Sequence, residues 1–287
     1  MAARQPHAFD SSHPAVPAVY LGGTVIIAMF AIQPVYVALS LAGGVACSLA
    51  FRGARETVRG LRWQLPVVAL VSLVNPLFSA SGSTELWRLG PTVVYLESLA
   101  FGACMGAMLV AVVLWLESAS RVLTQDRLLE LGARALPTVT LMVSMTMQLV
   151  PQLARRGRTV RSAYAACTAA GGETGGRHAQ VRLSDVLVSW AMEDSLERAD
   201  SMRARGWGSL PTRTTYRSVE FRGRDALALA LSVLLLLANA LLASVACGQW
   251  HFYPALPRLV AWWGYVPYAA LVLLPAALEL IGRLRWR

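Results

Sequence analysis

The feature that most constrains this chain is its set of long apolar runs without charge. Residues 11–51 contain no charged side chain, and a membrane-spanning helix needs about 20 predominantly apolar residues. This run is long enough for two spans, at about 16–32 and 35–51, separated near Gln33-Pro34. Further apolar runs predict spans at 64–80, 98–116, 226–247 and 259–278.

The low share of charged residues supports a membrane protein. Only 15% of the residues are charged, whereas soluble domains average about 25%. The alternation typical of a transmembrane β-barrel is absent from the sequence. We therefore expect an all-α integral membrane protein with about six transmembrane helices in three hairpins. The expected regions are an N-terminal membrane region at 1–116, a polar helical module at 117–225 and a C-terminal membrane hairpin at 226–287.

The distribution of arginine predicts the orientation in the membrane. The segment 52–63 carries four arginines against one acid, Glu56, and such loops lie on the cytoplasmic side. Both termini and the module at 117–225 are then cytoplasmic, as expected of a multi-pass protein of the cell (inner) membrane. The net charge of +10 is interpreted as topology and contact with the lipid bilayer, not as nucleic-acid binding.

The stretch 135–154 is uncharged but is not predicted to span the membrane. It is rich in Thr, Ser, Gln and Met, and arginine-rich segments flank it on both sides, so we expect an amphipathic or interfacial helix. Within it lie Met142, Met145 and Met147. A methionine stripe is usually packing, and less often an adaptable surface for partners.

The stretch 184–208 is predicted to form one helix with a defined end. Ser184 is a suitable N-cap, and an apolar face recurs at steps of three and four residues. Gly206 is suited to the position after the helix end, with Arg205 in the last turn. An ordinary glycine stop beside an arginine explains this end as well as a functional tip does. The apolar face comprises Val188, Met192, Leu196, Ala199 and Met202.

A second candidate helix, Pro151 to Ala170, precedes it. It carries a basic cluster followed by the small-residue run AYAACTAAGG. Arginine near a helix end with small neighbours is suited to docking against a carboxylate. Attraction to anionic headgroups is the plainer explanation of the cluster. The cluster comprises Arg155, Arg156, Arg158 and Arg161.

Little in the sequence indicates catalysis. There is no phosphate-binding loop, no HExxH motif and no metal-like spacing among the four cysteines. Glu97 and Glu279 lie at predicted span ends, where snorkelling to the interface is expected, and Asn75 is expected to form a hydrogen bond between helices. We expect no catalytic residue, metal ligand or cofactor. The rival classes are an integral-membrane enzyme and a stand-alone secondary transporter.

Three segments resemble the transmembrane T component of energy-coupling factor (ECF) transporters, the EcfT/CbiQ family. NPLFSASGSTELWRLGPTVVYLESLAFG resembles the connection between its third and fourth spans, and LVPQLARRGRTVRSAYAACTAAGG occupies the place of its first coupling helix. SLERADSMRARGWG resembles its second coupling helix, with the Ala-Arg-Gly motif at Ala204, Arg205 and Gly206. That last segment is the most specific of the three.

The resemblance implies a non-catalytic scaffold of an ABC-type importer. Such a scaffold couples two cytoplasmic ABC-type ATPases to a membrane-embedded, substrate-binding S component that takes up a vitamin or a metal ion. Arg205, with Arg203 nearby, would enter an acidic groove of one ATPase. The methionines at 142, 145 and 147 are the expected S-component interface.

The first docking motif departs from the family pattern. Its tip is Ala166-Cys167-Thr168 or Ala169-Ala170-Gly171, and neither contains arginine. Arg158 or Arg161, a few turns earlier, would then serve as the anchor, and the pair of ATPases would be asymmetric.

Overall fold

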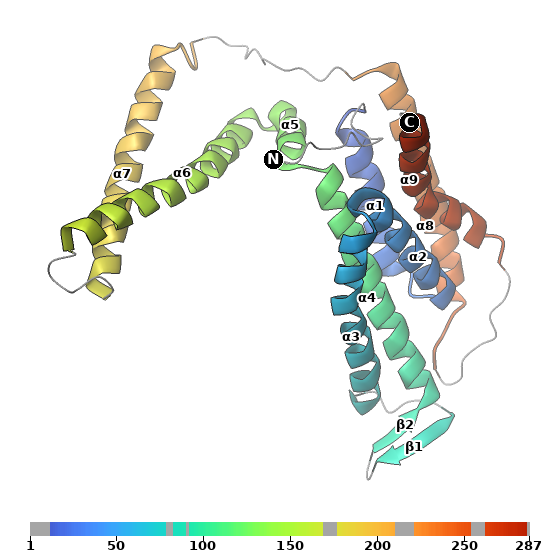
Figure 1. Ribbon diagram of the computed structural model, residues 1–287. Helices are drawn as coiled ribbons and strands as arrows, with labels where there is room; N and C mark the ends of the chain where they lie inside the picture. Colours follow the sequence, from blue (N-terminus) through green and yellow to red (C-terminus); the bar gives the residue numbers. More distant parts are fainter. Residues whose placement is uncertain are drawn as a thin grey trace. The chain divides into compact units, whose positions relative to one another are not determined.

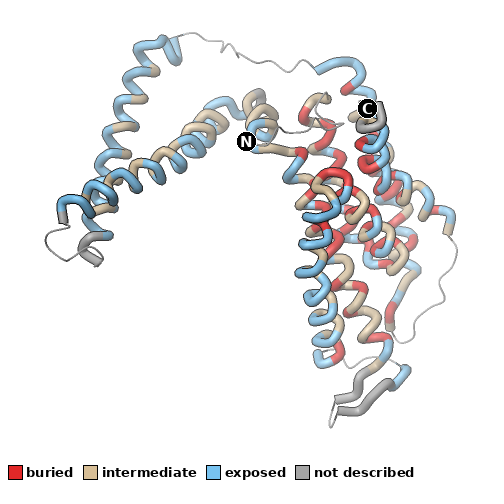
Figure 2. Tube along the Cα trace, in the orientation of Figure 1, coloured by how far each residue is buried: buried red, intermediate tan, exposed pale blue. Residues whose placement is uncertain are grey.

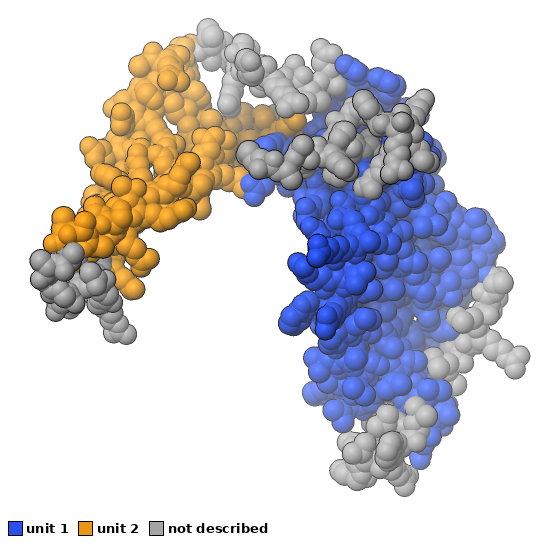
Figure 3. All heavy atoms as spheres, in the orientation of Figure 1, with its two compact units in different colours: residues 1–128, 220–287 blue, residues 129–219 orange. Residues whose placement is uncertain are grey.

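The computed structural model describes residues 12–78, 83–89, 92–168, 177–209, 221–253 and 262–285. The chain forms two compact units (Figure 3). Unit 1 comprises residues 1–128 and 220–287, and unit 2 comprises residues 129–219. In chain order the elements are α1 (Ala15–Phe30), α2 (Pro34–Arg52), α3 (Ala54–Phe78), β1 (Glu85–Leu89), β2 (Thr92–Tyr95), α4 (Leu96–Val122), α5 (Gln125–Ala135), α6 (Pro137–Thr168), α7 (Arg177–Ala204), α8 (Gly223–Gly248) and α9 (Tyr265–Arg285).

The predicted helical membrane architecture is confirmed in part. Within the described residues, five helices are long and apolar enough to cross a membrane: α2, α3, α4, α8 and α9. The expected first span corresponds to α1, which is apolar but has only 16 residues, or roughly 24 Å of helix. One short antiparallel hairpin, formed by β1 and β2, lies between α3 and α4 in an otherwise helical fold. The helix α6, with 32 residues, is long enough to span a membrane, but it is not among the helices that are also apolar enough to do so.

The arginine-rich segment 52–63 is not the loop that the sequence suggested. A single residue, Gly53, separates α2 from α3, and its φ of +86° lies in a region that favours glycine. The rest of the segment is the first part of α3. Arg52 contacts the carboxylate of Glu117 at the end of α4, and Arg121 contacts Glu56 at 2.8 Å. These ion pairs join the ends of three helices.

The core of unit 1 lies among α1, α2, α4, α8 and α9, as the buried positions in Figure 2 indicate. Two buried hydrogen bonds tie side chains to the backbone of other helices. The Tyr20 hydroxyl donates to the carbonyl of Leu271, and Trp115 Nε1 donates to the carbonyl of Ser40 at 3.1 Å. Large apolar side chains fill the remaining space, including Leu21, Tyr36, Leu114, Tyr268 and Val272.

Small residues allow close helix contacts in unit 1. Gly102 and Gly106 on α4 lie one turn apart and face the backbone of α3, where an added Cβ would be 3.0 Å from the Cα of Ser72 and of Val68 respectively. A Cβ at Gly43 would overlap Cγ1 of Val272 on α9. Such contacts are typical of membrane helices, which associate through small residues.

Buried polar groups of unit 1 test the predictions made for three side chains. Asn75 donates from Nδ2 to the carbonyl of Ser98 at 2.8 Å, which confirms the predicted hydrogen bond between α3 and α4. The snorkelling predicted for Glu97 and Glu279 is wrong, because both are nearly fully buried. Glu97 instead accepts hydrogen bonds from the backbone N–H of Thr84 at 3.2 Å and from the hydroxyl groups of Ser83 and Thr84, just before β1.

Unit 2 contains two long helices, α6 of 32 residues and α7 of 28 residues. The predicted N-cap at Ser184 is wrong. The helix α7 begins at Arg177, and the Ser184 hydroxyl donates within the helix to the carbonyl of Val181 at 2.7 Å. The segment 177–183 extends the predicted helix by about two turns.

Candidate functional site

The helices α6 and α7 cross at a small cluster of charged and aromatic side chains (Figure 1). Asp194 on α7 accepts from Arg156 Nη2 on α6 at 2.9 Å and is paired with Arg198 Nε, one turn further along α7, at 2.7 Å. Arg198 also donates to the Gln152 side chain on α6. The guanidinium of Arg156 lies 5.2 Å from the ring centroid of Trp190, within cation–π range.

The environment of Asp194 lowers the pKa of its carboxyl group. Desolvation raises the pKa, but the hydrogen bond and charge of Arg156 and the charge of Arg198 outweigh it, so the net shift is downward. Its side chain is 13% exposed, and those of the two arginines are about one third exposed. The carboxylate therefore stays ionised at neutral pH and holds α6 and α7 together.

The C-terminal end of α7 is closed by a Schellman motif. Gly206 has φ of +80°, its N–H donates to the carbonyl of Arg203 at 2.9 Å, and the N–H of Trp207 donates to the carbonyl of Met202 at 3.0 Å. These two bonds satisfy carbonyl groups that a helix end leaves open. The prediction that Gly206 follows the helix end is confirmed.

The side chain of Arg205 is exposed at this capped end, as are Ala204 and Arg203. Arg203 lies 3.9 Å from Asp200, and both side chains are about 80% exposed, so this ion pair contributes little. The tip thus presents two arginines on a backbone that the glycine fixes.

The first predicted docking segment lies on exposed surface of α6. Arg158, Arg161 and Ala166 are all exposed, and Arg158 Nε donates to the carbonyl of Ala154 in its own helix at 3.3 Å. Gly171 lies outside the described residues.

The two predicted docking segments lie on opposite sides of the crossing. The chain passes from the end of α6 at Thr168 to the start of α7 at Arg177, so those two ends lie on one side and the end of α7 on the other. Ala166 lies ten residues beyond Arg156, or roughly 15 Å along the helix. Arg205 lies eleven residues beyond Asp194, or roughly 16 Å. The structure does not gather these segments into one site.

The three predicted interface methionines do not share one face. Met142 and Met147 are 62% and 38% exposed. Met145 is less exposed and belongs with Leu141, Leu149 and Gln152 to the more sheltered face of α6.

The apolar face predicted on α7 is largely exposed. Val188, Met192 and Leu196 are each more than half exposed. The sheltered face of α7 is a different one, which includes Leu187, Asp194 and Arg198.

Sequence reasoning missed the cluster around Asp194. The spacing of Asp194 and Arg198, four residues apart on a helix, was visible in the sequence and is typical of an ion pair. The contribution of Arg156 and Trp190 was not visible, because it depends on where two helices cross.

Compared with known proteins, the chain matches no family model and no curated protein.

Proposed function

We propose that this chain is the transmembrane scaffold, or T component, of an ECF-type importer. The observation that carries the proposal is the exposed Arg205 at the capped end of α7, in a chain whose described residues include five candidate membrane spans. A guanidinium group on a fixed helix end can pair bidentately with carboxylates in a partner's groove. In this proposal the chain spans the cell (inner) membrane, and unit 2 and both chain termini lie on its cytoplasmic side.

The partners are two ABC-type ATPases and a membrane-embedded S component. The separation of the two docking segments on either side of the α6–α7 crossing suits two partners, one at Arg205 and one near Arg158, Arg161 and Ala166. The Asp194 cluster joins the two helices at their crossing, so that force applied at one tip reaches the other helix.

This chain itself hydrolyses nothing in the proposed mechanism. ATP binding and hydrolysis take place in the ATPases, and their movement reorients the S component, which carries a vitamin or a metal ion. The S component contacts the exposed apolar side chains of unit 2 in this proposal. They include Met142, Met147 and Met192.

The test is the charge reversal Arg205→Glu. We expect ATPase association at least roughly 30-fold weaker, because the loss of a buried charge contact costs about 2 kcal/mol or more. Uptake by the assembled transporter should fall with it, while membrane insertion is unchanged. The measurement is co-purification of the tagged chain with its ATPases, together with uptake in vesicles.

Two matched variants give the result its meaning. Arg205→Lys keeps the charge but loses the fork-shaped donor set, so it should weaken association to an intermediate degree. Arg182→Glu makes the same charge change at an exposed position near the other end of α7 and should leave the ATPase at the Arg205 tip bound. Wild-type association and uptake in Arg205→Glu would refute the assignment of the tip.

A further inference from the structure

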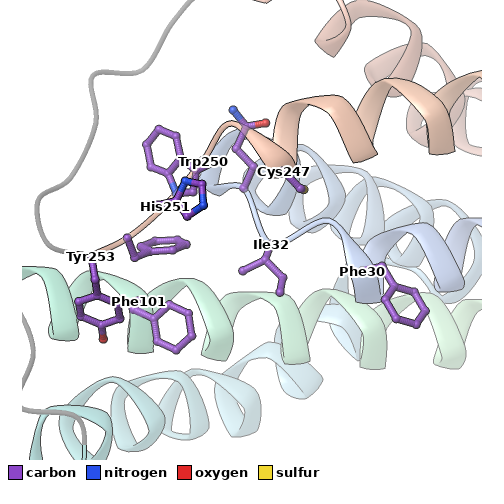
Figure 4. A pocket seen from close by; sticks show the side chains of 9 residues that line it. Phe30, Ile32, Phe101, Cys247, Trp250, His251 and Tyr253 are labelled. Atoms are coloured by element: carbon purple, nitrogen blue, oxygen red, sulfur yellow. The ribbon is translucent and has the colours of Figure 1, made fainter.

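A pocket in unit 1 lies where α1 and α8 end. It has a volume of about 340 Å³, which is within the size range of small-molecule sites. Figure 4 shows its aromatic lining, which includes Phe30, Phe101, Trp250, His251 and Tyr253. The rings brace one another, because Phe252 packs edge-on against Phe101 and against Trp250, with centroids 5.1 Å and 5.8 Å apart.

A second hollow of about 220 Å³ adjoins this pocket and follows the groove between α1 and α8. The two hollows share Phe30 and Cys247 as walls. The groove is lined almost entirely by apolar groups, and it extends from Cys247 back to Ala240. Seven residues of helix span roughly 10 Å, or about one third of a hydrocarbon core roughly 30 Å thick.

Most of the polar groups lie at the pocket end, and the hydroxyl of Ser244 in the groove donates to the carbonyl of Leu241 at 2.8 Å. Gln33 is 7% exposed, and its Nε2 donates to the Tyr265 hydroxyl at 2.6 Å. Among the described residues, neither Gln33 Oε1 nor Trp250 Nε1 has a hydrogen-bond partner. An unsatisfied buried group costs about 1–3 kcal/mol, which favours a ligand with polar groups at this end. Among the described residues, the pocket lining includes His251 but no residue with a permanent charge.

We propose that the pocket and groove together bind one zwitterionic phospholipid. One of its acyl chains occupies the groove between α1 and α8, and its headgroup lies in the aromatic pocket. Three observations support this ligand. The hollow is mainly apolar along the helices and more polar at their ends, and tryptophan and tyrosine mark that end as typical of a membrane interface. The lining residues that the structure describes include no basic cluster of the kind with which proteins bind anionic lipids.

The test is native mass spectrometry of the full chain in detergent with phosphatidylethanolamine added at low ratio. We expect one lipid per chain in the wild type and at least a fivefold lower bound fraction in Ala240→Phe, which fills the groove. The matched control is Ala238→Phe, since Ala238 is exposed on the same helix and lines neither hollow. This control should retain lipid like the wild type.

Further arms of the experiment identify the ligand. Equal retention by the wild type and Ala240→Phe overturns the proposal, and so does a preference for oleic acid or for anionic phosphatidylglycerol. If Ala240→Phe does not fold, photo-crosslinking of the wild type with a phospholipid that carries a diazirine at its chain end replaces it. Cross-links to residues 240–247 support the site, and cross-links confined to other helices overturn it.

Discussion

The helices inside unit 1 and the helices inside unit 2 are joined by different kinds of side chain. In unit 1 apolar side chains and small residues lie between the helices, as where Gly43 meets Val272. In unit 2 a charged cluster around Asp194 lies between the helices, whereas Val188 and Met192 are exposed. Unit 1 also exposes large apolar side chains, such as Leu73 and Leu227, but these belong to helices that are apolar enough to span a membrane. The exposed apolar side chains of α7 belong to a helix that is not among the candidate spans, which is the arrangement expected of a surface that binds partners.

The largest effect is expected from a methyl group added inside unit 1. In Gly43→Ala the new Cβ would overlap Val272, a β-branched side chain that cannot rotate away within its helix. Overpacking of this kind costs about 1–3 kcal/mol. We expect a lower thermal unfolding midpoint in detergent, measured by size-exclusion chromatography after heating.

The control for that variant is Gly22→Ala on α1. An added Cβ at Gly22 meets nothing within 4 Å, and alanine favours a helix over glycine by about 0.5–1 kcal/mol. Its midpoint should equal or exceed that of the wild type. A midpoint for Gly43→Ala as high as that of Gly22→Ala would mean that α2 and α9 do not pack as described.

The second-largest effect is expected on the contact between α6 and α7 in unit 2. Asp194→Ala leaves Arg156 and Arg198 facing each other without the carboxylate that they share. We expect α6 and α7 to separate, seen as a broader distance distribution between spin labels on the two helices. The unfolding midpoint of unit 1 should not change.

Asp200→Ala is the matched control on the same helix. Asp200 is about 80% exposed and lies 3.9 Å from Arg203, so its removal should leave the label distances as in the wild type. If both variants broaden the distances equally, the cluster at the crossing is not what joins the helices.

How much the sequence could predict differs between the two units. The spans in unit 1 follow from local hydropathy, and the hydrogen bond of Asn75 follows from the cost of a lone amide among apolar groups. The start of α3 directly after Gly53 was not predicted, because the arginines of this segment suggested a loop. Their exposed side chains are equally compatible with a helix. The spacing of Gly102 and Gly106 is a GxxxG pattern, which by itself predicts the close packing of α4 against a neighbouring helix.

In unit 2 the sequence predicted local features better than contacts. The end of α7 at Gly206 was predictable because a glycine cap is decided by one residue and its neighbours. The start of α7 was not, since Ser184 suits a cap and a helix interior alike. That the apolar face of α7 would be exposed depends on where α6 crosses it, which no local pattern contains.

A smaller effect on the contact between α6 and α7 is expected when the pH is lowered. The folded pKa of Asp194 lies below its ordinary value, so its stabilisation of the crossing is fully present above the ordinary carboxyl pKa of about 3.9. It is lost as the pH falls below that value and through the folded pKa. We expect the spin-label distances to broaden as the pH falls below about 4. Asp194→Asn should remove this dependence, and a dependence that persists in it would assign the change to another group.

The smallest effect on stability is expected at the exposed methionines of unit 2. They allow the exposed and the sheltered face of α6 to be compared directly. Met142→Gln changes a side chain that is 62% exposed, and surface substitutions usually lie within about 0.5 kcal/mol of the wild type. We expect normal folding but weaker co-purification with an S component. Met145→Gln, on the sheltered face of α6, should instead disturb the helix pair, seen in the spin-label distances. If the two variants behave alike, the faces of α6 do not divide between internal packing and partner binding.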